Sequence, residues 1–185
     1  MTDVYTRLRE HLDRLPAGFP ATESGVELRI LKRLFTADEA DLALNVGMKL
    51  EPASAIAARA GLPEAEAAGR LRQMSRKGLI FSIEEPDRPH VYMAAQFVIG
   101  IWEYHVNDLD PEFIREMDEY LPTLAQAAFT RVPQLRTIPI GTSVAAAMEA
   151  MPYEQAEELV RRQTKFLVAP CICRREHRIK GAGCD

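Results

Sequence analysis

The chain has 185 residues, of which 47% are hydrophobic and 27% are charged, and this ordinary globular composition excludes a disordered chain or a fibre. Acidic residues outnumber basic ones by 27 to 23, so no overall positive charge indicates a nucleic-acid binder. The longest uncharged run, Val91–Trp102, is far shorter than the ~20 residues that span a bilayer. The first residues lack a basic stretch followed by an apolar one, so no secretory signal is expected. These features predict a cytoplasmic protein without a membrane span.

The first 35 residues are predicted to form two N-terminal helices, because apolar side chains recur at helical spacing over residues 3–15 and 26–35. Thr36 can cap a third helix, which we expect to run to about Gly47. Its first turn holds Asp38 and Glu39, whose negative charges interact favourably with the helix dipole.

Residues 36–95 are predicted to form a winged-helix-like domain. Pro52 opens a short helix that ends at Gly61, and Pro63 opens a second helix that ends at Gly78. A β-hairpin over residues 79–93 follows, and helix, tight turn, helix and hairpin together are typical of a winged helix. The residues expected to be buried together in its core are Leu42, Ile56, Leu71, Met74, Leu79, Phe81 and Tyr92.

Residues 96–168 are predicted to be a helical extension. The apolar stretch Phe97–Tyr104 is expected to be a buried helix or a packing bridge, and Pro111 to start a helix that Pro122 kinks or restarts. The side chains of that helix expected to face inward are Phe113, Ile114, Met117 and Leu121. The later elements are expected to be an edge strand at 136–140, a weak helix at 145–151 and a helix that begins at Pro152. The predicted fold class is therefore mainly α with a small β-hairpin, followed by a cysteine-containing segment at 169–185.

The three cysteines, Cys171, Cys173 and Cys184, all lie in that last segment. An odd number of thiols in one short stretch is not typical of a secreted disulfide scaffold, and in a cytosolic chain it indicates metal or redox chemistry. Thiols two residues apart on extended or turned backbone can reach one metal centre. Four basic residues in the segment would lower thiolate pKa values and offset the charge of a thiolate-ligated cluster. We therefore predict that the three cysteines ligate a metal centre, with three unrelated thiols as the alternative.

Two glycines and one histidine bear on the type of metal centre. Gly181 and Gly183 allow the backbone to approach a metal site closely. His177 could complete a site of three cysteines and one histidine for zinc, although a solvated histidine in a charged run is the more ordinary interpretation. Zinc therefore stays open as the alternative to an iron–sulfur cluster.

Five segments of the chain match a known family, and they are Phe35–Leu44, Lys77–Ile80, Phe97–Ile101, Pro152–Ala156 and Val168–Arg174. In these segments the chain resembles iron–sulfur proteins with ferredoxin-type [4Fe–4S] motifs and an N-terminal winged-helix-like region. The resemblance implies a [4Fe–4S] cluster on Cys171, Cys173 and Cys184, with the fourth thiolate beyond Asp185, and it identifies these residues as the N-terminal part of a longer protein. Three ligands alone hold a cluster poorly, so we expect that this stretch can be isolated without one.

The function that the resemblance implies is electron transfer with a redox partner protein or subunit, and a homodimer stays open. The alternative is a DNA-binding transcription regulator that reads DNA with Pro63–Lys77 and senses metal or redox state through its cysteines. Residues 52–79 carry a net charge of +3, but the hairpin over 80–93 carries −2, and an acidic wing is unfavourable beside DNA phosphates. DNA binding is therefore the less favoured function.

A self-contained enzyme is not indicated by any motif. The serines show no nucleophile-elbow setting, and the chain contains no glycine-rich phosphate loop and no paired histidine and carboxylate motif. Acidic residues from Asp108 to Glu119 are expected to form an exposed negative face, either simply solvated or available to a basic redox partner.

Overall fold

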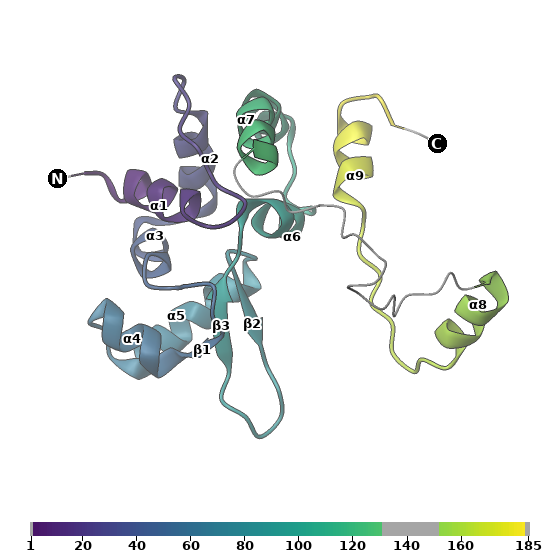
Figure 1. Cartoon of the computed structure of the whole chain (residues 1–185), viewed down its shortest axis with the longest axis horizontal. Coiled ribbons are helices and arrows are strands. Elements are labelled where there is room, and N and C mark those ends of the chain that lie inside the picture. The colour runs from purple at the N-terminus through teal and green to yellow at the C-terminus, as the bar shows by residue number, and fades with distance from the viewer. Residues whose placement is uncertain (1, 131–151, 184–185) are drawn as a thin grey trace, which may run out of the picture.

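The structure is a computed structural model that describes residues 2–130 and 152–183, and this part of the chain is mainly helical with one small antiparallel sheet (Figure 1). This confirms a mainly α fold with a small β-hairpin. Within these residues, no helix combines the length and apolar character needed to cross a membrane. The helices are α1 (Val4–Asp13), α2 (Val26–Leu34), α3 (Ala37–Ala43), α4 (Ala53–Ala60), α5 (Glu64–Arg76), α6 (Trp102–Tyr104), α7 (Pro111–Thr130), α8 (Tyr153–Arg161) and α9 (Ile172–Ile179), and the strands are β1 (Glu51–Pro52), β2 (Ile80–Ile83) and β3 (Val91–Ala94).

The sheet has three strands in the order β1-β3-β2, where the sequence predicted a hairpin alone. β2 and β3 pair antiparallel, with Ile80 opposite Ala94, so the predicted hairpin is confirmed. The additional strand β1 pairs with β3 and places Glu51 opposite Tyr92. Pro52 ends β1 and directly precedes α4, so it is both a strand residue and the expected helix opener. An edge strand tolerates proline because the missing N–H need not pair with a neighbour.

α3 begins where the sequence predicts. The Oγ1 of Thr36 accepts a hydrogen bond from the backbone N–H of Glu39 at 3.2 Å, and the Glu39 carboxylate accepts one from the N–H of Thr36 at 2.8 Å. This reciprocal capping box satisfies two N–H groups that have no partner inside the helix. α3 ends at Ala43, earlier than the expected end near Gly47.

α4 and α5 are joined by a tight turn, as expected. Gly61 ends α4 with a φ of 65°, a left-handed conformation that glycine adopts without a Cβ penalty. The inner face of α5 is the predicted one, since Ala67, Leu71 and Met74 are all buried. The basic residues of α5 consequently lie on its outer side.

Phe81 is the exception among the residues expected in this core. The other six are at most 2% exposed, whereas Phe81 is only partly buried. Phe81 follows the buried Ile80 on β2, and consecutive strand residues point to opposite faces. Its ring lies 5.6 Å from the ring of Tyr104, at the boundary of the core.

The helices α1, α2 and α7 surround an aromatic cluster. The ring of Phe19 lies 4.8 Å from that of Phe97 and 4.9 Å from that of Tyr120, whose hydroxyl donates to the carbonyl oxygen of Pro20 at 3.0 Å. This cluster belongs to one apolar core that extends from Leu8 to Ile172 and includes residues of all four predicted stretches. The division of the chain at residues 35, 95 and 168 stays a prediction.

Two details of α7 differ from the sequence prediction. Leu121 is 47% exposed, whereas Tyr120 and Leu124 are buried with Phe113. The buried stripe continues at steps of three and four residues and passes over Leu121. α7 also continues through Pro122, so this proline does not restart the helix.

The stretch Phe97–Tyr104 is a packing bridge rather than a continuous buried helix. Its backbone is non-helical at Val98, Ile99 and Gly100, and Ile99 is 71% exposed. Phe97 and Trp102 are buried and connect the sheet to α7. The predicted strand at 136–140 and the predicted helix at 145–151 lie outside the described residues, whereas α8 begins directly after Pro152 as expected.

Candidate metal centre

Helix α9 begins inside the Cys-x-Cys segment. Cys171 directly precedes the helix and has extended backbone angles of −77° and 123°, while Ile172 and Cys173 belong to the first helical turn. The N–H of Arg175 donates to the carbonyl oxygen of Cys171 at 3.0 Å and closes that turn. Cys171 therefore lies on extended backbone, whereas Cys173 lies in the first turn of the helix.

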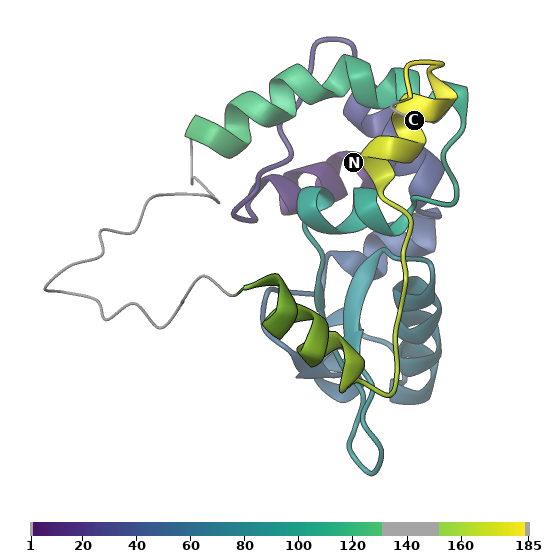
Figure 2. The same cartoon turned by 90° about the vertical axis from the view of Figure 1, so that its right-hand side faces the viewer.

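Three contacts hold α9 against the body of the protein. Ile172 is 8% exposed and belongs to the apolar core. The Nη1 of Arg175 donates to the Oδ1 of Asn107 at 3.2 Å, and the Nζ of Lys180 donates to the Oδ1 of Asp118 at 2.6 Å. Figures 1 and 2 show α9 beside the first half of α7. The two described thiols therefore occupy an anchored helix end.

Asn107 and Asp118 are anchor residues that the sequence did not identify. Their partners are 68 and 62 residues away along the chain. A single Asn or Asp in a polar stretch carries no local pattern that distinguishes an anchor from a solvated residue. Only the docked position of α9 makes their role visible.

Cys171 and Cys173 are both exposed free thiols with different electrostatic surroundings. The backbone N–H of Arg174 lowers the pKa of the Cys171 thiol, and the N–H of Cys173 and the charge of Arg174 act in the same direction. Partial burial raises the pKa of Cys173, and negative charge at Cys171 and at Glu176 adds to this increase. Cys171 is consequently the more readily formed thiolate, which is the metal-binding form of the side chain.

The surface around the thiols is basic. Arg174 and Arg178 are exposed, and neither makes an ion pair within residues 2–130 and 152–183. Glu176 is the acidic residue of α9, and its carboxylate Oε1 lies 2.6 Å from the Nζ of Lys180. Positive charge is therefore available to offset the negative charge of a thiolate-bound cluster.

After the last residue of α9, the chain turns back against this helix. Gly181 has a φ of 72°, and its N–H donates to the carbonyl oxygen of Arg178 at 3.1 Å. A Cβ at Gly183 would lie 3.4 Å from the Cα of Arg178, so the backbone of this glycine packs against α9. The close approach to a metal site stays a prediction. The third predicted ligand, Cys184, lies outside the described residues.

The described residues supply two of the three predicted ligands. No three His, Cys, Asp or Glu side chains in this part of the chain are grouped so that they could hold a metal ion. His177 is exposed and does not form such a group with Cys171 and Cys173. A metal centre of the predicted kind would therefore need Cys184 as well as the two thiols at the start of α9.

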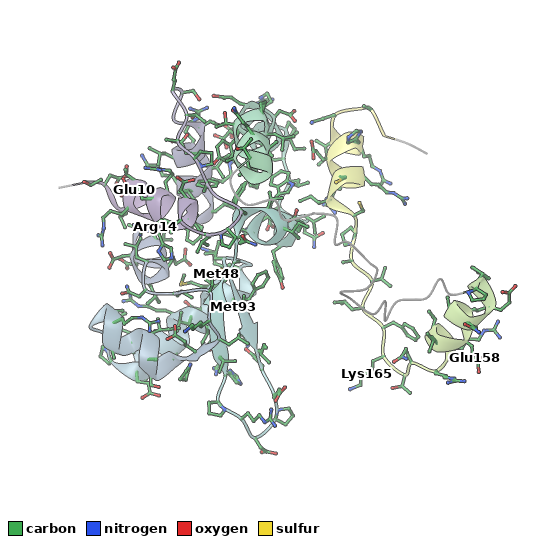
Figure 3. The ribbon with its side chains drawn as sticks, in the orientation of Figure 1. Glu10, Arg14, Met48, Met93, Glu158 and Lys165 are labelled. Carbon is green, nitrogen blue, oxygen red and sulfur yellow. The ribbon has the colours of Figure 1, made fainter. Side chains whose placement is uncertain are left out.

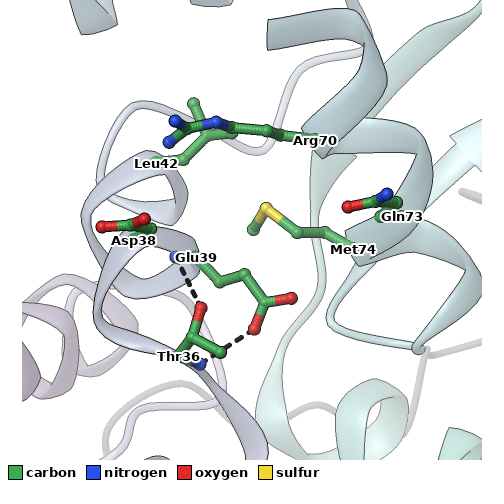
Figure 4. A pocket seen from close by; sticks show the side chains of 7 residues that line it. All are labelled: Thr36, Asp38, Glu39, Leu42, Arg70, Gln73 and Met74. Carbon is green, nitrogen blue, oxygen red and sulfur yellow. Dashed lines mark hydrogen bonds between the residues drawn. The ribbon is translucent and has the colours of Figure 1, made fainter. Parts of the chain in front are cut away.

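The candidate DNA-reading surface on the outer side of α5 is partly neutralised, because two of its four cations are ion-paired within the molecule. A pocket between α3 and α5 is lined by Thr36, Asp38, Glu39, Leu42, Arg70, Gln73 and Met74 (Figure 4). Arg70 pairs with Glu66, and the Nζ of Lys77 lies 2.7 Å from the Glu39 carboxylate. These pairs reduce the positive charge that α5 would present to a phosphate backbone.

The hairpin turn adds further negative charge. Glu84, Glu85 and Asp87 are exposed there, and Arg88 is paired with Glu85 at 2.7 Å. The acidic hairpin expected from the sequence is thus exposed in the structure. It opposes the approach of duplex DNA along this edge.

The acidic segment from Asp108 to Glu119 is not a free negative face. Arg33 contacts the carboxylates of Asp110, Glu112 and Glu116 at 2.9, 2.7 and 3.3 Å. Arg29 pairs with Glu119 at 2.9 Å, so the segment is partly neutralised by α2. A docking surface for a basic redox partner is consequently weaker here than the sequence predicts.

Comparison with protein-family models, with curated proteins and with solved structures finds no match for this chain. The functional argument therefore depends on the geometry of α9 and on the resemblance of the cysteine segment.

Proposed function

We propose that this chain is part of an iron–sulfur electron-transfer protein in which Cys171, Cys173 and Cys184 ligate a cluster, most simply [4Fe–4S]. The observation that carries the proposal is the placement of two exposed thiols at the start of α9, a helix anchored by Ile172 and Lys180. A redox centre that exchanges electrons with a partner must be near the surface and in a fixed position. A fourth thiolate from outside these residues completes the ligand set.

The chemistry of the donors supports iron–sulfur rather than a hard cation. Thiolates are soft ligands that select iron–sulfur clusters, zinc or copper(I) over magnesium or calcium. Backbone N–H groups near Cys171 can donate to cluster sulfur, and the charges of Arg174 and Arg178 favour the reduced, more negative state. When bound, the cluster supplies one-electron transfer, and this chain supplies its ligands and its charged surroundings.

We further propose that residues 36–95 form a winged-helix-like domain. The support comes from the succession of α3, α4, a tight turn, α5 and the β2–β3 hairpin, with β1 as a third strand. The pairing of Arg70 and Lys77 and the acidic hairpin favour contact with protein rather than with DNA. In this proposal the domain serves assembly or docking of the redox protein.

A DNA-binding regulator is the second candidate. It is favoured by Arg72 and Arg76, which are exposed on α5 and make no ion pair with a carboxylate among the described residues. A salt titration against random-sequence duplex DNA tests it. Tight binding with a steep salt dependence, lost in Arg72→Ala and Arg76→Ala, would replace the electron-transfer proposal.

The test of the main proposal is anaerobic purification of the natural gene product, followed by iron, sulfide and zinc analysis and by EPR before and after reduction. We expect iron and sulfide in matching amounts and an EPR signal that appears or disappears on reduction. Cys171→Ser and Cys173→Ser should each reduce the iron content strongly, whereas His177→Ala should leave it unchanged.

Two results would contradict the proposal. Stoichiometric zinc without sulfide, lost in His177→Ala, would establish a zinc site of cysteines and one histidine. Iron content that survives both serine substitutions would show that Cys171 and Cys173 are ordinary thiols.

A further inference from the structure

A cleft of about 540 Å³ lies between the end of α5 and the turn that follows α6. Small-molecule sites in proteins have volumes of about 300–1,000 Å³, so this cleft has the size of such a site. Its lining comes from α2, α5, α6 and α7 and from the turn after α6. Figure 1 shows α6 between α7 and the sheet, where these distant parts of the sequence meet.

The cysteine-bearing part of the chain leaves this cleft open. Among the described residues, none from 152 to 183 belongs to its lining. Figure 3 shows two residues of this part, Glu158 and Lys165, standing apart from the body of the protein. The groups that line the cleft are therefore accessible from this side.

His105 borders the cleft with its ring held in one orientation. The residue is 6% exposed, and its Nδ1 donates to the carbonyl oxygen of Ile101 at 2.7 Å. A carbonyl oxygen only accepts, so the proton of the neutral ring lies on Nδ1 and Nε2 is an acceptor. Every buried side-chain nitrogen or oxygen of the described residues has a partner, whereas Nε2 has none there, so Nε2 must reach the cleft. A nearly buried histidine with an open acceptor indicates a ligand that carries a hydrogen-bond donor.

The cleft also presents one cation and one anion that are not ion-paired. Arg76 at the end of α5 and Asp108 in the turn after α6 are exposed, and neither makes an ion pair within residues 2–130 and 152–183. The other two cations of the lining are occupied, because Arg33 contacts three carboxylates and Lys77 contacts both oxygens of Glu39. One positive and one negative group therefore remain for a ligand.

This balance of charge favours a zwitterion over a phosphate ester. A phosphate ester carries about −1.5 to −2 charges at neutral pH. Those charges would meet Asp108 and the carboxylates around Arg33, with Arg76 alone to offset them. A ligand with one carboxylate and one ammonium group matches both free charges.

Apolar surface lies beside these charged groups. The ring of Tyr104 packs against Phe81, yet Tyr104 is 56% exposed and borders the cleft. Leu34 and Phe113 line the cleft as members of the apolar core. An apolar side chain of a ligand can therefore be buried here together with the charged end of the same molecule.

We propose that this cleft binds a free α-amino acid with an apolar side chain. The carboxylate of the amino acid pairs with Arg76, and its ammonium group donates to Asp108 and to the Nε2 of His105. Its side chain packs on Tyr104. This inference is independent of the iron–sulfur proposal, because it uses none of the cysteines.

NMR chemical-shift titration with L-phenylalanine and with L-leucine tests the proposal. We expect saturable shifts at the amides of residues 104–108 and of the end of α5. Two analogues each remove one charge, since 3-phenylpropionate lacks the ammonium group and 2-phenylethylamine lacks the carboxylate. Each analogue should bind about ten-fold or more weakly than L-phenylalanine, because hydrogen bonds to charged groups are the strong ones.

Charge-removing variants assign each end of the ligand. Arg76→Gln should weaken L-phenylalanine about ten-fold and leave 2-phenylethylamine unchanged, whereas Asp108→Asn should weaken L-phenylalanine and leave 3-phenylpropionate unchanged. Arg72→Gln is the matched control, because Arg72 is exposed on the same helix but does not line the cleft. Circular dichroism should show unchanged folding in all three variants, since the replaced side chains are exposed.

Three outcomes would overturn the proposal. The first is the absence of shifts at these amides with millimolar L-phenylalanine and L-leucine. The second is tighter binding of inorganic phosphate than of either amino acid, lost in Arg76→Gln, which would make the cleft an anion site. The third is an equal loss of L-phenylalanine binding in Arg72→Gln and Arg76→Gln.

Discussion

The Nζ of Lys180 lies 2.6 Å from the Oδ1 of Asp118, and this contact joins the end of α9 to the middle of α7 across 62 residues of sequence. Lys180 also contacts Glu176 of its own helix at 2.6 Å. Hydrogen bonds to Asp118 and Glu176 raise the pKa of Lys180, so its charge is secure at neutral pH. The two carboxylates hold the lysine at the junction of α7 and α9.

Asp118→Asn should loosen α9 without unfolding the protein. The two side chains are 31% and 46% exposed, so their attraction is screened by water and contributes roughly 0–1 kcal/mol. Hydrogen–deuterium exchange should become faster at the amides of α9 and stay unchanged in α5. Glu158→Gln, which removes an exposed ion pair between α8 and Arg162 directly after it, is the control. Equal exchange of α9 in the two variants would show that Lys180 does not anchor it.

Gly78→Ala should destabilise the protein more than Gly61→Ala. Both glycines are left-handed, with φ values of 80° and 65°, so each alanine carries a backbone cost of about 1–2 kcal/mol. A Cβ at Gly78 would also lie 2.4 Å from the Cβ of Tyr104, whereas nothing lies within 4 Å of one at Gly61. Urea unfolding measures the difference, and equal losses for the two variants would contradict the close packing of Tyr104 against Gly78.

Signals from neighbouring residues in the sequence were sufficient to predict much of the fold. The capping box of Thr36 and Glu39, the glycine turn at Gly61 and the hairpin after Gly78 depend on neighbouring residues, and all three appear where the sequence predicts them. Apolar periodicity likewise identified the buried face of α5. These elements form because short-range chemistry and the core favour the same conformation.

The features that the sequence missed depend on contacts between distant segments. β1 consists of two residues and exists only through its pairing with β3, for which Glu51 and Pro52 give no local signal. Leu121 and Tyr120 are adjacent apolar residues, and the packing of α7 decides which of them is buried. The cysteine pattern located the candidate ligands but did not indicate that Cys173 lies in the first turn of a helix. Their binding of a metal stays a prediction.

Cys171 should react with iodoacetamide at lower pH than Cys173 in metal-free protein. The N–H of Arg174 lowers the pKa of Cys171, whereas partial burial raises that of Cys173, and only the thiolate reacts. Mass spectrometry of peptides alkylated at a series of pH values measures both rates. In urea the difference should vanish, because it depends on the folded helix end. Equal rates in the native protein would mean that the start of α9 does not influence Cys171.

Glu39 should make the stability of the protein sensitive to acid. Burial raises the pKa of Glu39, but hydrogen bonds from Lys77 and from the backbone N–H of Thr36 outweigh it, so the pKa is lowered overall. A carboxyl group whose pKa is lower in the folded state stabilises fully above its unfolded pKa of about 4.3. This stabilisation is lost as the pH falls through the folded value.

Glu39→Gln isolates this charge, because glutamine retains the acceptor that completes the capping box with Thr36. We expect the variant to be less stable at neutral pH by up to about 1 kcal/mol, since Lys77 is 44% exposed and its attraction is screened. The difference from the wild type in urea unfolding should shrink as the pH falls below about 4. Asp38→Asn, in the same helical turn but without an ion pair among the described residues, should have a smaller effect. Parallel stability curves for the wild type and Glu39→Gln down to acid pH would show that the pair with Lys77 contributes no stability.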